Sequence, residues 1–167
     1  KFNSVILNYD DSSSDLFFWY QQLIAESLGK KGKGFLPVIS NAPKDHHSLL
    51  QLYIDGPKDK IFYIFSEKES LGNKLKTKKI ANKIEHLHNK NIDQIKNAQK
   101  NALRKALLKN KIPFREFTIN SIDEQTLGEL FSYFILETSI VGNLSKINPF
   151  NQPAVEQVKI FTKKLLS

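Results

Sequence analysis

The sequence predicts an α/β fold of three layers, in which helices cover both faces of a mostly parallel β-sheet. Short β-branched and apolar segments alternate along the chain with longer segments of helical character. Most of the short segments are apolar on both faces, as expected of parallel strands buried between two helical layers. A chain of 167 residues, 40% of them hydrophobic, can bury one sizeable core. We therefore expect a single domain.

The first half of the chain is expected to contain three strands and two helices. Asp10–Ser14 is a polar turn that can cap the first helix, and Gly29 ends that helix. The pair Gly56-Pro57 ends the second helix. In chain order the elements are strand Phe2–Tyr9, helix Asp15–Leu28, strand Phe35–Ser40, a short helix from Pro43 to Ile54, and strand Lys60–Phe65.

The second half is expected to be mainly helical. The pattern Ser121-Ile-Asp-Glu124 has the spacing of a capping box, and Gly142 is expected to stop the helix that follows it. Pro153 suits the first position of a terminal helix, where its missing N–H costs nothing. The elements are a loop at 67–77, a helical region at 78–109 broken near Asn89–Asn91, strand Pro113–Ile119, a long helix to Val141, and the terminal helix.

Composition limits the classes of partner and of site. The net charge of +8 suits an anionic partner, whether nucleic acid, an anionic surface or a phosphorylated metabolite. Only two of the 25 basic residues are arginine, and a lysine-rich surface is also typical of proteins from AT-rich genomes. No cysteine is present to form a disulfide or a thiolate metal site. No apolar run approaches the roughly 20 residues of a membrane span, and no signal peptide opens the chain, so we expect a cytoplasmic protein without a membrane partner.

The chain contains no methionine and begins at Lys1, directly on the segment that the pattern predicts as a strand. We therefore expect a partial or excised domain of a larger protein. The alternative is that modified methionines were left out of the sequence, which would shift some spacings by one residue.

Three segments contain residues that could carry chemistry. Gln22 and Glu26 are four residues apart on one helix face, which is also the spacing of an ordinary exposed polar pair. His46 and His47 are adjacent at a helix start; neighbouring side chains diverge on a helix, so they form a poor metal pair. The third segment, at 147–159, joins a turn to a helix start and ends at Lys159, which by itself indicates only a well-anchored helix.

Together these segments resemble glucose-6-phosphate isomerases. The third resembles the family's C-terminal signature Phe-Asp-Gln-x-x-Val-Glu-x-x-Lys, with Asn151 in place of the aspartate. The run at 20–30 resembles the segment that carries the catalytic glutamate, and the run at 47–51 resembles a His-x-x-x-Gln stretch, with His46 where glutamine is usual. The motifs occur in the family's order. The resemblance implies a flavodoxin-like sugar-isomerase domain, here residues 1–167, forming the C-terminal half of a two-domain enzyme.

The resemblance also implies roles for four residues. Glu26 would be the base that moves a proton between C2 and C1 of a cis-enediol, and Gln22 would position the substrate. His47 would act as acid and base in ring opening, since an imidazole gives and takes protons near neutrality. Lys159 would assist at the ring oxygen or stabilise negative charge there. The reaction interconverts glucose 6-phosphate and fructose 6-phosphate, a step of glycolysis, and needs no metal or redox cofactor.

Two further properties follow from the resemblance. The family's first domain, which this chain lacks, supplies the hydroxyls that grip the phosphate and an arginine near the enediol. Its active sites lie at a homodimer interface, so His47 is expected to complete the site of the neighbouring subunit.

Two other functions remain open from the sequence. A non-catalytic sugar-phosphate-binding domain would share the fold but would not need Glu26, His47 and Lys159 together. A nucleic-acid binder could use basic residues that recur along one helix, but aromatic residues do not interleave with them as stacking platforms would, so we expect no nucleic-acid partner. These basic residues are Lys96, Lys100, Arg104, Lys105, Lys109 and Lys111.

Overall fold

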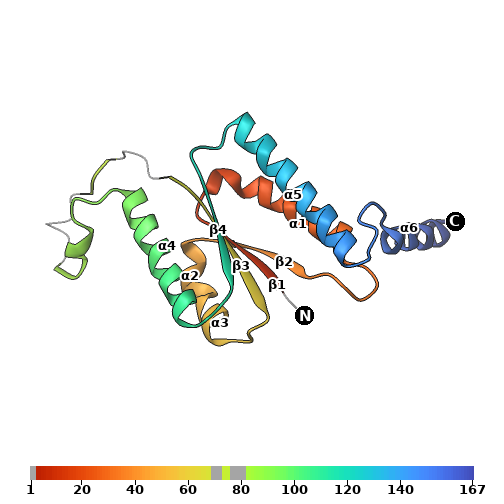
Figure 1. Ribbon diagram of the computed structural model, residues 1–167, viewed down its shortest axis with the longest axis horizontal. Coiled ribbons are helices and arrows are strands. Elements are labelled where there is room, and N and C mark those ends of the chain that lie inside the picture. Colours follow the sequence, from red (N-terminus) through yellow and green to blue (C-terminus); the bar gives the residue numbers. More distant parts are fainter. Residues whose placement is uncertain (1–2, 69–72, 76–81) are drawn as a thin grey trace.

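A computed structural model describes residues 3–68, 73–75 and 82–167 of the chain. Within these residues four parallel strands form one sheet in the order β2–β1–β3–β4 (Figure 1). The strands are β1 (Asn3–Asn8), β2 (Leu36–Asn41), β3 (Lys60–Glu67) and β4 (Phe114–Ile119). The chain leaves β1 towards β2 on one side and then crosses to β3 on the other. The strand order therefore reverses beside β1, which makes a topological switch point.

Helices cover both faces of this sheet, which confirms the predicted three-layer α/β fold. One core contains Ile6 of β1 packed with aromatic residues of α1 (Ser14–Leu28) and α5 (Glu124–Leu144). The other contains Val5 and Leu7 of the same strand, packed with residues of α3 (Leu50–Asp55) and α4 (Ile92–Lys109). Successive side chains of a strand point to opposite faces, so β1 contributes to both cores and is buried from Ser4 to Asn8.

Two predicted helical regions are divided in the structure. The segment from Pro43 to Ile54 forms α2 (Lys44–Ser48) and α3, which meet at Leu49. The second region contains a 3-10 helix, η2 (Asn82–Leu87), and then α4, with the predicted break between them. Asn91 caps α4 because its Oδ1 accepts from the Gln94 N–H at 2.7 Å, while Gln94 Oε1 accepts from the Asn91 N–H at 3.1 Å. The predicted helical residues 78–81 and much of the predicted loop at 67–77 lie outside the described residues.

Both predicted ends of α5 are wrong. Its N-cap is Asp123, whose Oδ1 accepts from the Thr126 N–H at 2.8 Å, and not Ser121. At the other end the helix runs through Gly142 to Leu144. Gly142 is buried there, and a Cβ added to it would lie 3.2 Å from side-chain atoms of Pro149. The glycine therefore allows the loop after α5 to pack closely on the helix, where the sequence pattern indicated a helix stop.

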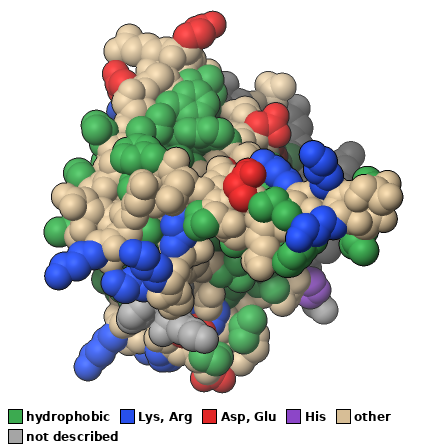
Figure 2. All heavy atoms as spheres, turned by 90° about the vertical axis from the view of Figure 1, so that its right-hand side faces the viewer, with side chains coloured by type: hydrophobic (Ala, Val, Ile, Leu, Met, Phe, Trp, Pro, Cys, Tyr) green, Lys and Arg blue, Asp and Glu red, His purple; other side chains and the backbone are tan. Residues whose placement is uncertain are grey.

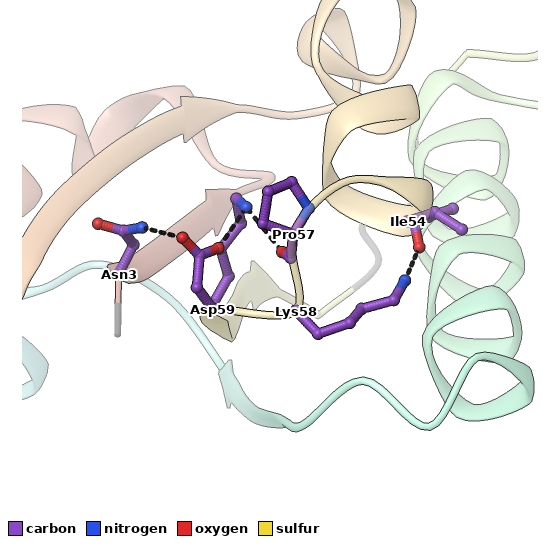
Figure 3. A network of polar contacts seen from close by, with 6 residues as sticks. Asn3, Ile54, Pro57, Lys58 and Asp59 are labelled. Carbon is purple, nitrogen blue, oxygen red and sulfur yellow. Dashed lines mark hydrogen bonds and ion pairs between the residues drawn. The ribbon is translucent and has the colours of Figure 1, made fainter. Parts of the chain in front are cut away.

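A polar network fixes the amino ends of the two central strands (Figure 3). Asp59, just before β3, accepts from Asn3 Nδ2 of β1 at 3.2 Å and from Lys60 Nζ at 2.6 Å. Lys60 Nζ also donates to the carbonyl of Pro57 at 3.0 Å, and Lys58 Nζ donates to the carbonyl of Ile54 at the end of α3. These contacts hold the α3–β3 connection against the start of β1.

The terminal helix α6 (Pro153–Leu166) begins at Pro153, as predicted, and extends away from the sheet and its covering helices (Figure 1). Every one of its residues is exposed, including Val158, Phe161 and Leu165. Figure 2, which looks onto the side from which α6 extends, shows both apolar and basic side chains on this surface. None of the helices in the described ranges is both long enough and apolar enough to cross a membrane.

Candidate active site

Glu26 lies in the last turn of α1, near the edge of the sheet where the strands begin. α1 begins after the carboxyl end of β1 and runs back towards the start of that strand. The C-terminus of α1 therefore lies at the edge of the sheet where the strands begin. The helix ends at Gly29, where an added Cβ would lie 2.7 Å from the carbonyl oxygen of Ala25. In the following loop Gly34 has φ +98, and an added Cβ would lie 2.8 Å from the Leu28 carbonyl oxygen, so only glycine fits this turn.

Both carboxylate oxygens of Glu26 accept hydrogen bonds from glutamine side chains. Gln22 Nε2 donates to Oε1 at 3.0 Å from one turn earlier on α1. Gln152 Nε2 donates to Oε2 at 2.7 Å from the loop that precedes α6. The predicted pair of Gln22 and Glu26 is therefore brought together, and a third residue from a distant segment completes it.

This third residue, Gln152, was not predicted from the sequence as part of the site. Gln152 belongs to the C-terminal signature, but the resemblance implies no role for it. The signal was present, because a glutamine inside a motif with a matching family pattern is a candidate ligand. Its contact with Glu26 joins residues 126 positions apart, and residue spacing alone reveals only neighbours on the same helix or strand.

A cavity of about 350 Å³ opens beside Glu26, between the end of α1, the loop after it and the start of α6. Glu26, Gln152 and Asn151 line it, together with Lys30 and Lys31. Its walls are tied together by a hydrogen bond of 2.7 Å from Lys30 Nζ to the carbonyl of Asn148. Desolvation by the surrounding protein lowers the pKa of the Lys30 ammonium. The cavity thus combines a carboxylate, three amides and two lysine side chains, a set that can hold a small polar ligand and move a proton on it.

Lys159 does not line this cavity. It lies on the second turn of α6 with 66% of its side chain exposed, and its Nζ pairs with Glu156 Oε1 at 2.7 Å. It borders a different hollow on the surface of α6, together with Val158 and Thr162. The structure therefore places Glu26 and Lys159 in separate crevices of this chain.

His47 lies at the opposite edge of the sheet from Glu26. It is an exposed residue of α2, which follows the carboxyl end of β2. The Asp45 carboxylate holds this helix start on the strand end, since it accepts from the Asn41 N–H at 2.8 Å and from Ser40 Oγ at 3.0 Å. A strand of six residues spans about 20 Å, so Glu26 and His47 of one chain cannot touch the same small substrate.

The neighbouring His46 has a structural partner. Its Nε2 lies 2.6 Å from the hydroxyl of Tyr9, at the end of β1. Burial lowers the pKa of His46, against a smaller opposite effect of the Asp45 charge, and burial raises the pKa of Tyr9 well above its usual value. Both shifts favour the neutral pair, in which the tyrosine donates to the imidazole.

In the described part of the chain no group of three or more histidine, aspartate or glutamate side chains could hold a metal ion.

Comparison with known proteins gives relatives over nearly the whole chain. No protein-family model matches it. The glucose-6-phosphate isomerase of Methanocaldococcus jannaschii is 38% identical over 164 residues, which are 98% of this chain and 40% of that protein. The glucose-6-phosphate isomerase of Campylobacter jejuni is 33% identical over 169 residues, covering 98% of this chain and 42% of that protein. The chain thus spans about two fifths of the length of these curated relatives.

Two solved structures are also similar to this chain over nearly its whole length. A hypothetical protein from Thermus thermophilus superposes with a TM-score of 0.89 at 28% identity, over 98% of this chain and 41% of that one. A glucose-6-phosphate isomerase from Chlamydia trachomatis superposes with a TM-score of 0.79 over 98% of this chain and 34% of that one; at 16% identity this likeness shows the fold alone. The resemblance carried by the three motifs is therefore confirmed: this chain is a homologue of glucose-6-phosphate isomerases over about two fifths of their length.

Proposed function

We propose that this chain is the C-terminal sugar-isomerase domain of a cytoplasmic, homodimeric glucose-6-phosphate isomerase. In the complete protein it would help interconvert glucose 6-phosphate and fructose 6-phosphate by ring opening and proton transfer through a cis-enediol. The observation that carries the proposal is the arrangement at Glu26, which lines a cavity and is held there by amides from two separate segments. The identity with isomerases over nearly the whole chain supports it.

Glu26 is the proposed shuttle base. A carboxylate can take a proton from C2 through one oxygen and return it to C1 through the other. Gln22 and Gln152 each donate to one of these oxygens, which fixes the plane of the carboxylate and leaves each oxygen further acceptor capacity for substrate. Such a positioned base contributes about 10²–10⁴-fold to the rate. Gln152 is therefore proposed as a positioning residue for Glu26.

His47 and Lys159 are the proposed ring-opening residues, and both require assembly to reach Glu26. His47 is exposed at the opposite edge of the sheet, as expected of a residue that completes a neighbouring subunit's site. Lys159 belongs to a helix whose residues are all exposed, so few packing contacts fix its position relative to α1. Our proposal for Lys159 requires α6 to take a different position in the complete protein, with the Lys159–Glu156 pair opened.

The test uses the complete protein with Glu26→Gln and a matched control, Glu129→Gln. Glu129 of α5 accepts a hydrogen bond of 3.0 Å from Gln125, four residues earlier, as Glu26 does from Gln22. Glu129 thus has the same kind of partner, a glutamine one helical turn earlier, but it does not line the cavity. We expect kcat to fall at least about 100-fold in Glu26→Gln and to change less than about twofold in Glu129→Gln.

The separation of Lys159 from Glu26 favours a second candidate, a non-catalytic sugar-phosphate-binding domain. Exchange of the substrate's C2 hydrogen with solvent deuterium distinguishes the two. The isomerase proposal expects rapid exchange with the unmodified protein and loss of exchange in Glu26→Gln. Binding of glucose 6-phosphate without exchange of its C2 hydrogen in the unmodified protein would establish the binding domain instead.

A further inference from the structure

A second cavity, of about 270 Å³, lies where the parallel strands end at the switch point beside β1. In open α/β sheets this crevice is the usual place for a ligand. Its walls come from the ends of three strands and from one face of α4. The lining residues include Tyr9, Asp10, Glu67, Lys96, Lys100 and Thr118. None of them lines the cavity at Glu26, which lies at the other edge of the sheet.

Two lysines of α4 line this cavity, Lys96 and Lys100. They are one turn apart, and both are half-buried. Lys100 Nζ donates to the buried hydroxyl of Ser66 at 2.9 Å. Among the residues that the structure describes, no carboxylate lies within ion-pairing distance of either ammonium. By contrast, Arg104 of the same helix pairs with Glu116 at 2.7 Å.

A partly desolvated ammonium is unfavourable, and an anion in the cavity would stabilise both lysines. Both oxygens of the nearby Asp10 accept from Ser12 Oγ, at 2.9 and 2.8 Å. Glu67 and Thr118 also line the cavity, and such side chains can bind hydroxyl groups. The wall thus offers the two lysines of α4 for a phosphate and polar groups for a short polyol.

We propose that this switch-point cavity binds a small phosphorylated polyol, with its phosphate between Lys96 and Lys100, at a site separate from Glu26. The site is independent of the proposed isomerase activity. Tyr9 forms part of the wall of this cavity, and its hydroxyl hydrogen-bonds His46, the residue next to His47. A ligand in the cavity would therefore also contact Tyr9.

The first experiment is residue-resolved lysine acylation of the complete protein, read by mass spectrometry, with glycerol 3-phosphate as the probe. We expect saturable protection of Lys96 and Lys100, by at least about threefold, with Lys105 and Lys109 unchanged. The latter two have the same spacing on the exposed part of α4 and serve as internal controls. Glycerol, which lacks the phosphate, should protect none of the four. This measurement uses the unmodified protein and does not depend on the folding of a variant.

The second experiment compares glycerol 3-phosphate binding, measured by calorimetry, in Lys96→Gln/Lys100→Gln and in Lys105→Gln/Lys109→Gln. We expect the first variant to lose one binding site, or to weaken it at least about tenfold, and the second to bind as the unmodified protein does. Glu26→Gln should retain the site. The proposal is overturned by equal protection of all four lysines, by no protection, or by unchanged binding in Lys96→Gln/Lys100→Gln.

Discussion

A hydrogen bond to Tyr9 fixes His46, a residue at which the sequence departs from the isomerase pattern. His46 occupies a position where the isomerase pattern usually has glutamine, so its imidazole would be expected to disturb the start of α2. In the structure the imidazole bonds the Tyr9 hydroxyl at 2.6 Å, and the two rings meet edge to face with centroids 5.7 Å apart. His46 therefore anchors α2 to the end of β1, and His47 is presented outward beside it.

This anchoring predicts a pH dependence of stability. Burial lowers the pKa of His46 below its usual value of about 6.5, so the unfolded chain binds a proton more readily than the folded one. The stabilising contribution of neutral His46 is thus present above about pH 6.5 and is lost as the pH falls through its folded pKa. Thermal unfolding midpoints of the complete protein, measured between about pH 5 and 8, should fall less steeply towards acid in His46→Gln than in the unmodified protein.

The control is His47→Gln, at the exposed neighbouring residue, in which the midpoint should fall towards acid as steeply as in the unmodified protein. Equal pH profiles for His46→Gln and the unmodified protein would contradict this.

At the scale of single residues, the sequence predicted the pair Gln22 and Glu26 because helical spacing places them side by side. It could not predict that Gln152 would reach the second oxygen of Glu26, because that contact depends on where the loop after α5 lies. It also could not show that Lys159 stands apart from them. A motif gives the identity and order of the residues, and the packing of α6 decides their distances.

Among the elements, strands were predicted more closely than helix ends. β1 to β4 follow apolar segments whose limits are marked by turns, so each predicted strand overlaps the observed one. Helix ends depend on single side chains. Asp123 takes the cap that the pattern gave to Ser121, since its carboxylate reaches the Thr126 N–H. Gly142 lies inside α5, where its missing side chain makes room for Pro149.

The role of Gly142 can be tested against a second glycine of the same helix. Gly128 of α5 has no atom within 4 Å of an added Cβ, so Gly128→Ala should raise the free energy of unfolding by about 0.5–1 kcal/mol through helix propensity alone. At Gly142 any side chain would press on Pro149. We therefore expect Gly142→Leu to lower the free energy of unfolding and to reduce kcat of the complete protein, because the displaced loop carries Gln152.

Denaturant unfolding and initial rates measure the two effects. Gly128→Ala should leave kcat unchanged within about twofold. If Gly142→Leu were as stable and as active as Gly128→Ala, the close contact with Pro149 would not position the site.

For the whole molecule, the central question is how Glu26 and His47 would serve the proposed reaction from opposite edges of the sheet. The sequence predicted the three-layer fold and the parallel sheet from the alternation of its segments, and the structure confirms both. The β2 strand alone separates the two edges by about 20 Å. The structural arrangement thus agrees with a site shared between two copies of the chain, which no pattern in the residues themselves reveals.

Mixing two inactive variants of the complete protein tests this sharing. In a symmetric dimer of Glu26→Gln with His47→Ala, one of the two shared sites keeps both native residues, and the other loses both. Equal mixing gives about half heterodimers, so about a quarter of the unmodified activity should return. Glu26 and Lys159 are proposed to serve the same subunit's site, so mixing Glu26→Gln with Lys159→Ala should restore none. Activity recovered by that second mixture would remove Lys159 from its own subunit's site. A first mixture that stays inactive at every ratio, after subunit exchange is verified by mass, would place His47 outside the neighbouring site.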